Sequence, residues 1–358
     1  MPPLPRGGVA VLTGAPSRTG SARTGGCEAP LSVDSRGPAA RSPHRGQKGK
    51  HGEPPEGPDS PPLFRVPLHR LDARGDVRAG SAVGAGPPDG GQLMDERKVA
   101  AFYDVVGNTY DQSLYFLACE APYRSEIRRL SAGRRFRRLV DLGCGTGKQT
   151  VMLAPLADEV VAVDISPSSL QQAEARCAGA NVRNVRFLHE SIVALSLESG
   201  SVDGIFSYGD VISHVHDAYR QVFRESARVL RPGGFLACEV DGKWELDMLL
   251  HDPQERARAR AARGVGHLRV WRDIPCKTFT DRELRGDLAA AGLRPVSMRG
   301  VNILHCLLPP SVLMGLPHSV GAGWRAISTA LRGLDAVVAR LPWFYRLAST
   351  RLVVAVRE

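Results

Sequence analysis

One short segment, LVDLGCGTG at 139–147, constrains the fold of this chain more than any other. Its apolar start predicts a buried strand, and the alternating glycines predict a tight loop before a helix: Gly143, Gly145 and Gly147. Glycine is needed where a ligand approaches the backbone closely, and the N-terminus of the next helix offers unpaired N–H groups. The segment therefore predicts an α/β fold with a ligand-binding loop after this strand.

Two well-known nucleotide-binding loops do not fit this segment. The dinucleotide motif GxGxxG needs a glycine where Lys148 stands. The P-loop GxxxxGK needs a glycine at Leu142 and a Ser or Thr at Gln149. The loop is therefore predicted to serve a different kind of ligand.

Strand-like apolar runs alternate with helical patterns along the rest of the chain. The runs lie at 138–142, 159–164, 185–189, 204–207, 234–240, 295–304 and 351–356. Such alternation predicts a doubly wound sheet, mostly parallel, with helices on both faces. Before the first strand, residues from 95 onward show helical spacing, and Pro122 suits the start of a second helix.

Composition divides the chain near residue 92. Residues 1–92 contain many of the 26 prolines and 38 glycines, and Phe64 is their only aromatic residue. Such a segment cannot bury enough apolar area to offset its conformational entropy, so we expect a disordered extension at 1–92 and a folded domain at 93–358. The net charge of +10 is compatible with anionic metabolites, acidic lipids or nucleic acid, and selects none of them.

The seven cysteines are scattered, with no CxxC pair and no Cys/His cluster at metal-ligand spacing. We therefore expect no metal site and no disulfide framework, and a cytoplasmic location. Residues 300–324 carry no Asp, Glu, Lys or Arg, but Pro309, Pro310 and Pro317 argue against a membrane-spanning helix.

Together with four later segments, the glycine loop resembles the class I S-adenosylmethionine-dependent methyltransferases. Asp164 ends the second strand, and the other matching segments are FLHESIVAL (187–195), SVDGIFS (201–207) and RVLRPGGFL (228–236). The resemblance covers about residues 97–240. It implies a three-layer Rossmann-like sheet of seven strands whose last strand is antiparallel, S-adenosylmethionine as cofactor, and methyl transfer to a small-molecule acceptor.

The resemblance also implies a set of cofactor-binding residues. Asp164 is expected to accept both ribose hydroxyls, and Ser191 stands where the family often has an aspartate for the adenine amino group. The complete set comprises Asp141, Gly143, Cys144, Gly145, Gly147, Asp164, Ile165, Ser191, Ile192 and Tyr208.

Candidate catalytic residues lie in the loop after the fourth strand, SYGDVISHVHD at 207–217. Asp210, His214 and His216 are the candidates, with His214 favoured because a histidine pKa lies near neutrality. The alternative is that His214 only caps the next helix. Tyr103 and Tyr110 share a face of the first helix and are candidates for the acceptor pocket, with packing onto the core as the equal alternative.

Two insertions are expected on the substrate side, a basic one at 252–280 and an apolar one at 300–348. The first places arginines on a predicted helix, which could face an anion or simply solvent. The second contains an apolar helical stripe, which could wall a hydrophobic acceptor site, contact a membrane surface, or pack on its own domain: Trp324, Ile327, Leu331, Leu334, Val338 and Leu341.

Two alternatives to a small-molecule methyltransferase remain. The arginine-rich insertion suggests an RNA methyltransferase, although no RNA-binding module is visible and SYGD replaces an NPPY-type motif, so nucleic acid is not the expected partner. Ser191 in place of aspartate suggests a cofactor-binding protein without transferase activity. The sequence assigns neither the acceptor nor the oligomeric state.

Overall fold

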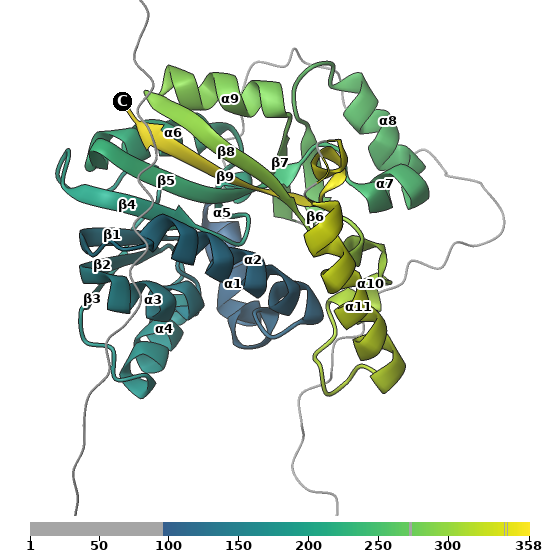
Figure 1. The fold of residues 1–358 in the computed structure, drawn as a ribbon, viewed down its shortest axis with the longest axis horizontal. Coiled ribbons are helices and arrows are strands. Elements are labelled where there is room, and N and C mark those ends of the chain that lie inside the picture. The colour runs from purple at the N-terminus through teal and green to yellow at the C-terminus, as the bar shows by residue number, and fades with distance from the viewer. Residues whose placement is uncertain (1–95, 272–273, 340, 342) are drawn as a thin grey trace, which may run out of the picture. The chain divides into compact units, whose positions relative to one another are not determined.

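The computed structural model describes residues 96–271, 274–339, 341 and 343–358, with the side chains of 106–110, 271 and 310 excepted. The predicted disordered extension at 1–92 lies outside the described residues. Within the described part, helices connect most of the strands from residue 136 onward, as the sequence predicts, and Figure 1 shows a twisted sheet with helices on both faces.

Seven strands form the predicted sheet. Five neighbours run parallel in the order β3-β2-β1-β4-β5, and β9 lies antiparallel between β5 and β8. The predicted antiparallel last strand is therefore confirmed. The bounds are β1 Phe136–Leu142, β2 Ala157–Asp164, β3 Val185–His189, β4 Val202–Ser207, β5 Leu230–Gly242, β8 Leu293–Val301 and β9 Thr350–Arg357.

A hairpin that the sequence analysis missed brings the sheet to nine strands in the described part of the chain. It consists of β6 (Leu268–Trp271) and β7 (Ile274–Phe279), and β7 pairs in parallel with the end of β5. The helix predicted for the basic insertion ends early, since α8 covers only Pro253–Ala261. The hairpin forms because Ile274, Cys276 and Phe279 are all buried, which a solvated helix would not achieve.

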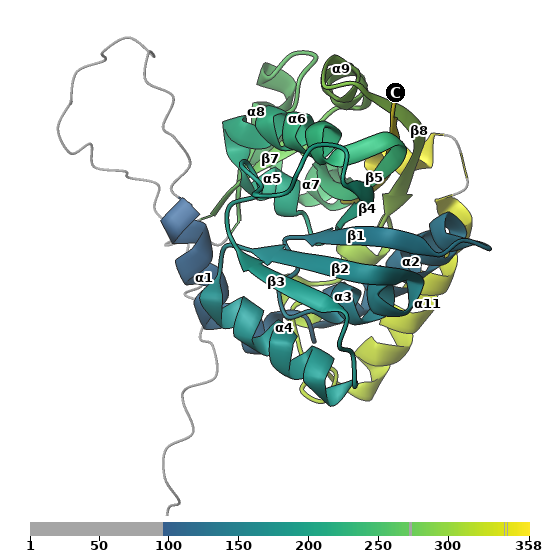
Figure 2. The same ribbon diagram turned by 90° about the vertical axis from the view of Figure 1, so that its left-hand side faces the viewer.

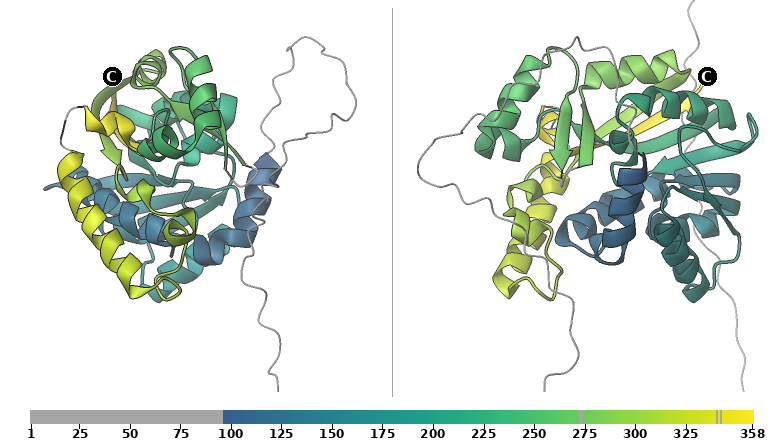
Figure 3. Two further views of the ribbon diagram at one scale, coloured as in Figure 1. Left: turned by 90° about the vertical axis from the view of Figure 1, so that its right-hand side faces the viewer. Right: turned by 180° about the vertical axis from the view of Figure 1, so that it is seen from behind.

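The remaining helices connect the strands and cover both faces of the sheet (Figures 2 and 3). Pro122 does not begin a helix as predicted, because α2 starts at Leu114 and contains Pro122. The lost backbone hydrogen bond is tolerated because α2 buries Tyr123, Ile127 and Leu130 beyond it. The bounds are α1 Glu96–Tyr110, α2 Leu114–Ser131, α3 Lys148–Leu153, α4 Pro167–Gly179, α5 Val211–His214, α6 Tyr219–Val229, α7 Leu246–His251, α9 Asp281–Ala290, α10 Pro310–Leu313 and α11 Ala322–Val338.

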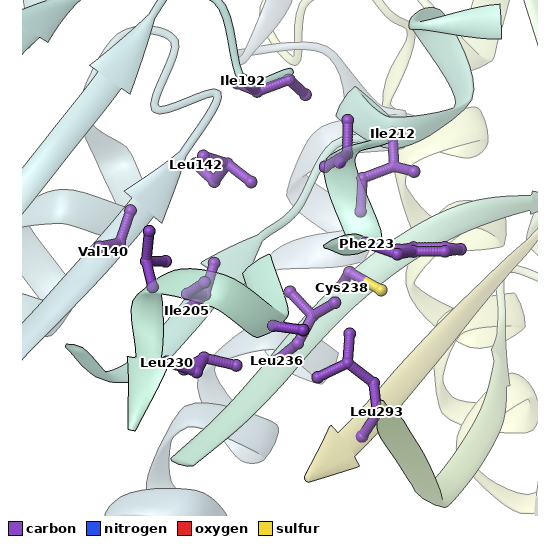
Figure 4. Close-up of a cluster of buried hydrophobic side chains, with 14 of the residues drawn as sticks. Val140, Leu142, Ile192, Ile205, Ile212, Phe223, Leu230, Leu236, Cys238 and Leu293 are labelled. Carbon is purple, nitrogen blue, oxygen red and sulfur yellow. The ribbon is translucent and has the colours of Figure 1, made fainter. Parts of the chain in front are cut away.

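The sheet is buried on both faces. Val140 and Leu142 of β1 belong to a core cluster that includes Phe223 of α6, shown in Figure 4. Leu139, the residue before Val140, packs in a second cluster with Ile127 of α2. Because successive side chains of a strand point to opposite faces, this division places one core on each side of the sheet, as the three-layer prediction requires.

Among the described helices, none is both long and apolar enough to cross a bilayer. The same residues contain no group of three or more His, Cys, Asp or Glu side chains arranged to hold a metal ion.

Candidate functional site

Several of the segments singled out in the sequence meet around one cavity at the carboxyl ends of the parallel strands. The cavity encloses about 1180 Å³, including its open mouth, and is lined by the glycine loop, the end of β2, the loop after β3, the loop after β4, and helices α1 and α2. Ligands of open α/β sheets bind at this edge, where the order of the strands reverses. The arrangement supports a binding site for one ligand that spans several loops.

The glycine loop is held against β2 by its own backbone. The N–H groups of Gly143 and Cys144 both donate to the carbonyl oxygen of Val163, at 2.8 and 2.9 Å. At Gly143 φ is +74°, and a Cβ atom there would lie 2.4 Å from the side chain of Val211. Gly147 caps α3 at φ +80°. Both positions therefore require glycine, and Gly143, Cys144 and Gly145 line the cavity wall.

Asp164 lies in the cavity wall at the end of β2, as predicted for a ribose-binding carboxylate. Its Oδ2 accepts the N–H of Gly145 at 2.8 Å, and its Oδ1 accepts the N–H of Ser166 at 2.9 Å. Each oxygen keeps a second lone pair, so the carboxylate can accept two hydroxyls of a ribose at the same time. Burial raises the pKa of Asp164, and the backbone N–H bonds act in the opposite direction.

Glu96 at the start of α1 is a cavity residue that the sequence analysis missed. Its Oε1 accepts the hydroxyl of Ser191 at 2.6 Å, and both side chains line the cavity with Ile192. The carboxylate absent from position 191 is thus supplied by a residue 95 positions earlier. A glutamate just before a helical pattern could have been noticed, but only tertiary structure pairs it with Ser191.

Asp141 does not lie in the cavity wall. It is buried behind the loop, where it accepts the hydroxyl of Thr150 at 2.5 Å. Burial raises its pKa to about 7. Its position favours support of the loop from behind, and a direct contact with a cofactor stays a prediction.

Asp111 is a second cavity residue without a sequence signal. Its Oδ2 accepts hydrogen bonds from Thr146 at 2.8 Å and from Arg176 at 2.9 Å. Its Oδ1 is buried with no hydrogen-bond partner in the described part of the chain. An unpaired buried carboxylate oxygen is costly, so a bound cationic group at this end of the cavity would satisfy it.

His214 and Tyr103, predicted from separate patterns, are brought together by the fold. The hydroxyl of Tyr103 and Nε2 of His214 are 3.0 Å apart, and both residues line the cavity. On the other side of the ring, Nδ1 lies 3.3 Å from Sγ of Cys276. The pKa expected near neutrality is wrong, because burial lowers the pKa of His214 to about 4. The side chain of Tyr110 lies outside the described residues.

Asp210 is adjacent to the cavity and not in its wall. It precedes α5 with φ +59°, and its Oδ1 is buried with no partner among the described residues. Burial, together with the nearby carboxylates of Asp241 and Glu239, raises the pKa of Asp210 well above its usual range. A raised pKa favours the protonated form of the carboxyl group, which can donate a hydrogen bond.

Glu239 of β5 fixes the loop that carries these residues, and the sequence analysis missed it. It accepts the N–H of Gly209 at 2.9 Å, the hydroxyl of Thr350 at 2.6 Å and the hydroxyl of Tyr123. The ring of Tyr123 in turn stacks on Tyr208 at a centroid distance of 4.5 Å, and both rings line the cavity. Buried polar contacts of this kind make the aromatic wall rigid.

Neither predicted insertion contributes a described residue to the cavity wall. The segment 308–331 packs on α2 through Leu114 and Leu117, whereas Phe116 and Tyr123 of α2 line the cavity. Helix α2 thus separates the apolar insertion from the cavity.

Three of the six described lysines and arginines of the basic insertion pair with nearby carboxylates. Arg269 pairs with Glu245 at 2.8 Å, and Arg258 pairs with Glu255 at 2.9 Å. The predicted role of this insertion in holding an anionic part of the acceptor has no geometric support in these contacts.

Comparison with known proteins agrees with this architecture. Residues 139–234 match the sequence profile of the family described as "Methyltransferase domain". A demethylmenaquinone methyltransferase of Listeria monocytogenes serotype 4a is 30% identical over 148 residues, which are 40% of this chain and 62% of that protein. The enzyme of the same name from Lactococcus lactis subsp. lactis is 27% identical over 150 residues, 40% of this chain and 59% of that protein.

The chain thus spans about three fifths of the length of the curated relatives that it matches. Among solved structures, the [4+2]-cyclase SpnF aligns with a TM-score of 0.52 and 17% identity, covering 73% of this chain and 95% of that chain. At this identity the likeness concerns the fold alone, and a protein described as a cyclase shares it. The reaction must therefore be argued from the site.

Proposed function

We propose that this chain, whose residues 139–234 form a domain of the class I methyltransferase family, transfers a methyl group from S-adenosylmethionine to a small aromatic or hydrophobic molecule. The observation that carries the proposal is the single cavity around which the glycine loop, Asp164, Ser191 and the loop 208–215 converge. These four segments are far apart in the sequence and meet only in the folded chain. The demethylmenaquinone methyltransferases, as partial relatives, support the same reaction class.

The residues present fit the cofactor at both of its ends. The two unused lone pairs of Asp164 suit the ribose hydroxyls, and Glu96 with Ser191 suits the adenine amino group. At the opposite end, the unpaired Oδ1 of Asp111 suits the ammonium group of the methionine part. Each assignment uses an oxygen that the described structure leaves able to accept a further hydrogen bond.

When bound, S-adenosylmethionine supplies an electrophilic methyl group on a sulfonium. The chain's contribution is to position the acceptor and exclude water from the attack path, because the sulfur leaves as a neutral thioether. The walls available for an acceptor are aromatic or apolar: Val99, Tyr103, Phe116, Tyr123, Met152, Tyr208, Val211 and Val215. These walls support a flat, largely apolar acceptor with few polar groups.

Tyr103 and His214 are the groups that we assign to proton removal from the acceptor. The low pKa of His214 keeps its ring neutral at pH 7, so one ring nitrogen carries a lone pair. The thiol of Cys276 lies 3.8 Å from the carbonyl oxygen of Ile274, so its sulfur can accept the Nδ1–H of His214. Nε2 then accepts the hydroxyl proton of Tyr103, whose oxygen can accept the proton that the acceptor releases.

The two alternatives receive less support. The hypothesis of an RNA substrate was based on the arginines of the basic insertion. Two of these arginines, Arg258 and Arg269, are paired with glutamates of their own domain. The hypothesis of a protein that binds the cofactor without catalysis was based on Ser191 in place of aspartate. In the structure, Glu96 supplies a carboxylate at this position. A cytoplasmic location stays a prediction that rests on the unpaired, buried cysteines of the described residues.

The test combines binding with product detection. Isothermal titration calorimetry with S-adenosylhomocysteine should give saturable binding to one site, and Asp164→Ala should weaken it. Mass spectrometry should detect a mass increase of one methyl group when chemically reduced demethylmenaquinone with a short side chain is supplied with S-adenosylmethionine. Absence of binding would refute the cofactor assignment, whereas binding without methylation across a panel of phenols and quinols would favour the non-catalytic alternative.

A further inference from the structure

Helix α11 buries polar side chains and exposes apolar ones, which is the reverse of an ordinary surface helix. Its two buried side chains are polar, Ser328 and Asp335. Its larger apolar side chains face solvent, with Leu334 and Val337 exposed by 53% and 59%. The prediction that this apolar stripe packs on its own domain is therefore wrong for most of its residues.

Specific hydrogen bonds fix this orientation. The carboxylate of Asp335 accepts three successive backbone N–H groups, those of Ile303, Leu304 and His305, at 3.0, 2.7 and 3.0 Å. The hydroxyl of Ser328 lies 2.9 Å from Nε2 of His305. Rotating the helix to bury its apolar side would leave these buried groups unpaired, at a cost of about 1–3 kcal/mol for each group. The exposed apolar side is thus a stable property of the fold.

The apolar surface continues beyond the helix. We define the apolar face as Trp324, Ile327, Leu334, Val337, Leu341, Trp343 and Phe344, all of which are exposed. Trp343 is exposed by 74%. Scattered apolar residues are normal on a protein surface, but a concentration that includes two tryptophans marks an interaction site.

The segment that carries this face is rich in positive charge, and one of its arginines, Arg346, pairs with Asp281 of α9 at 3.5 Å. Between residues 300 and 349 the sequence contains a single acidic residue, Asp335, which is buried and turned inward. Four arginines occur in the same stretch, at 325, 332, 340 and 346. The guanidinium of Arg346 lies 5.9 Å from the ring centroid of Trp343. Arginines beside exposed tryptophans are typical of a surface that rests in the headgroup region of a lipid bilayer.

We propose that the apolar face docks this protein on an anionic lipid surface. The tryptophan, phenylalanine and aliphatic side chains enter the boundary between headgroups and acyl chains, and the arginines contact lipid phosphates. A membrane fits better than a protein partner because a segment with four arginines and one buried carboxylate suits a surface of uniform negative charge. The proposal goes beyond methyl transfer and does not depend on it.

Helix α2 lies between the segment that carries the apolar face and the cavity. Leu331 of α11 packs near Leu114 of α2, and Phe116 of α2 lines the cavity. Figures 1 and 2 show α11 beside α2.

Vesicle co-sedimentation of the full chain tests the proposal. The probes are large unilamellar vesicles of phosphatidylcholine alone and of phosphatidylcholine with phosphatidylglycerol. We expect the wild type to sediment with the anionic vesicles, and Ile327→Glu with Leu334→Glu to lower the partition coefficient by about tenfold or more. Leu250→Glu is the matched control, because Leu250 is exposed by 58% on α7 and should leave partitioning unchanged.

Three outcomes would overturn the proposal. The wild type could fail to sediment with anionic vesicles, or the double variant could sediment as well as the wild type. Size-exclusion chromatography with light scattering could reveal a dimer that the double variant converts to a monomer, in which case a second copy covers the face. If the double variant melts at a lower temperature than the wild type, the vesicle experiment is repeated with Trp343→Ser, because Trp343 is the most exposed side chain of the apolar face.

Discussion

The hydroxyl of Tyr103 lies 3.0 Å from Nε2 of His214, across a gap of 111 positions in the sequence. Both side chains line the same cavity, and their rings meet edge to face at a centroid distance of 5.8 Å. The contact joins a helix that precedes the sheet to the loop after β4, where the methyl group is expected to be transferred. It is the feature on which our proposed proton path depends.

His214 should stay neutral throughout the neutral range. Burial lowers its pKa to about 4, so protonation begins only well below the ordinary histidine value, and the hydrogen bond with Tyr103 persists at pH 5.5–8. Nitrogen-15 NMR of the ring should give constant shifts in this range and a proton on Nδ1, the nitrogen that faces Cys276. The His214→Gln variant identifies the signal. A titration with a midpoint near 6.5, or a proton on Nε2, would contradict the proposed arrangement.

Replacing Tyr103 should separate catalysis from cofactor binding. Tyr103→Phe removes the hydroxyl that contacts His214 and keeps the ring, so turnover should fall by about tenfold or more while affinity for S-adenosylhomocysteine stays unchanged. Steady-state kinetics and calorimetry measure the two quantities. Tyr345→Phe is the control, because that hydroxyl binds Asp281 and not a cavity residue. Equal turnover in the two variants would remove Tyr103 from the proton path.

Replacing Asp164 should weaken the binding of the cofactor. Asp164→Ala removes both proposed contacts with the ribose, and the expected loss of binding free energy is about 1–3 kcal/mol. Calorimetry with S-adenosylhomocysteine measures it. Asp158→Ala serves as control, since Asp158 begins the same strand and its exposed side chain pairs with Arg135. Wild-type affinity in a folded Asp164→Ala protein would show that the ribose binds elsewhere.

Glu96 should recognise the adenine amino group. S-inosylhomocysteine carries an oxygen in place of that amino group, so the wild type should bind it less tightly than S-adenosylhomocysteine. Glu96→Gln should reduce this discrimination by about 1 kcal/mol, because an amide can donate to the oxygen of the analogue. Competition binding with the two ligands gives the ratio. An unchanged ratio would leave Ser191 as the more important contact.

Residues 1–92 should be dispensable for folding. The buried apolar side chains of the described residues lie between Val99 and Ala355. A protein that begins at Met94 should therefore keep its melting temperature and its affinity for S-adenosylhomocysteine. Differential scanning calorimetry and titration test both properties. Loss of soluble protein on truncation would show that the extension is structural.

Local signals predicted the framework well. The strands β1, β2 and β3 and the glycine loop were found because each depends on neighbouring residues: apolar runs of strand length, and glycines where φ is positive. Asp164 was placed correctly because the end of a strand fixes the edge of the sheet at which its side chain emerges. The β6–β7 hairpin was missed because arginines near it suggested a solvated helix, and its burial depends on pairing with β5.

The sequence by itself determined the class of fold and the loop for the cofactor, because these follow from short-range patterns of apolar residues and glycines. Only the tertiary structure decided that Glu96 contacts Ser191 and that His214 is buried beside Tyr103. It also decided that α11 turns Asp335 inward and its apolar side outward. Periodicity specifies that a helix has two faces, whereas hydrogen-bond donors elsewhere in the chain select which face is buried.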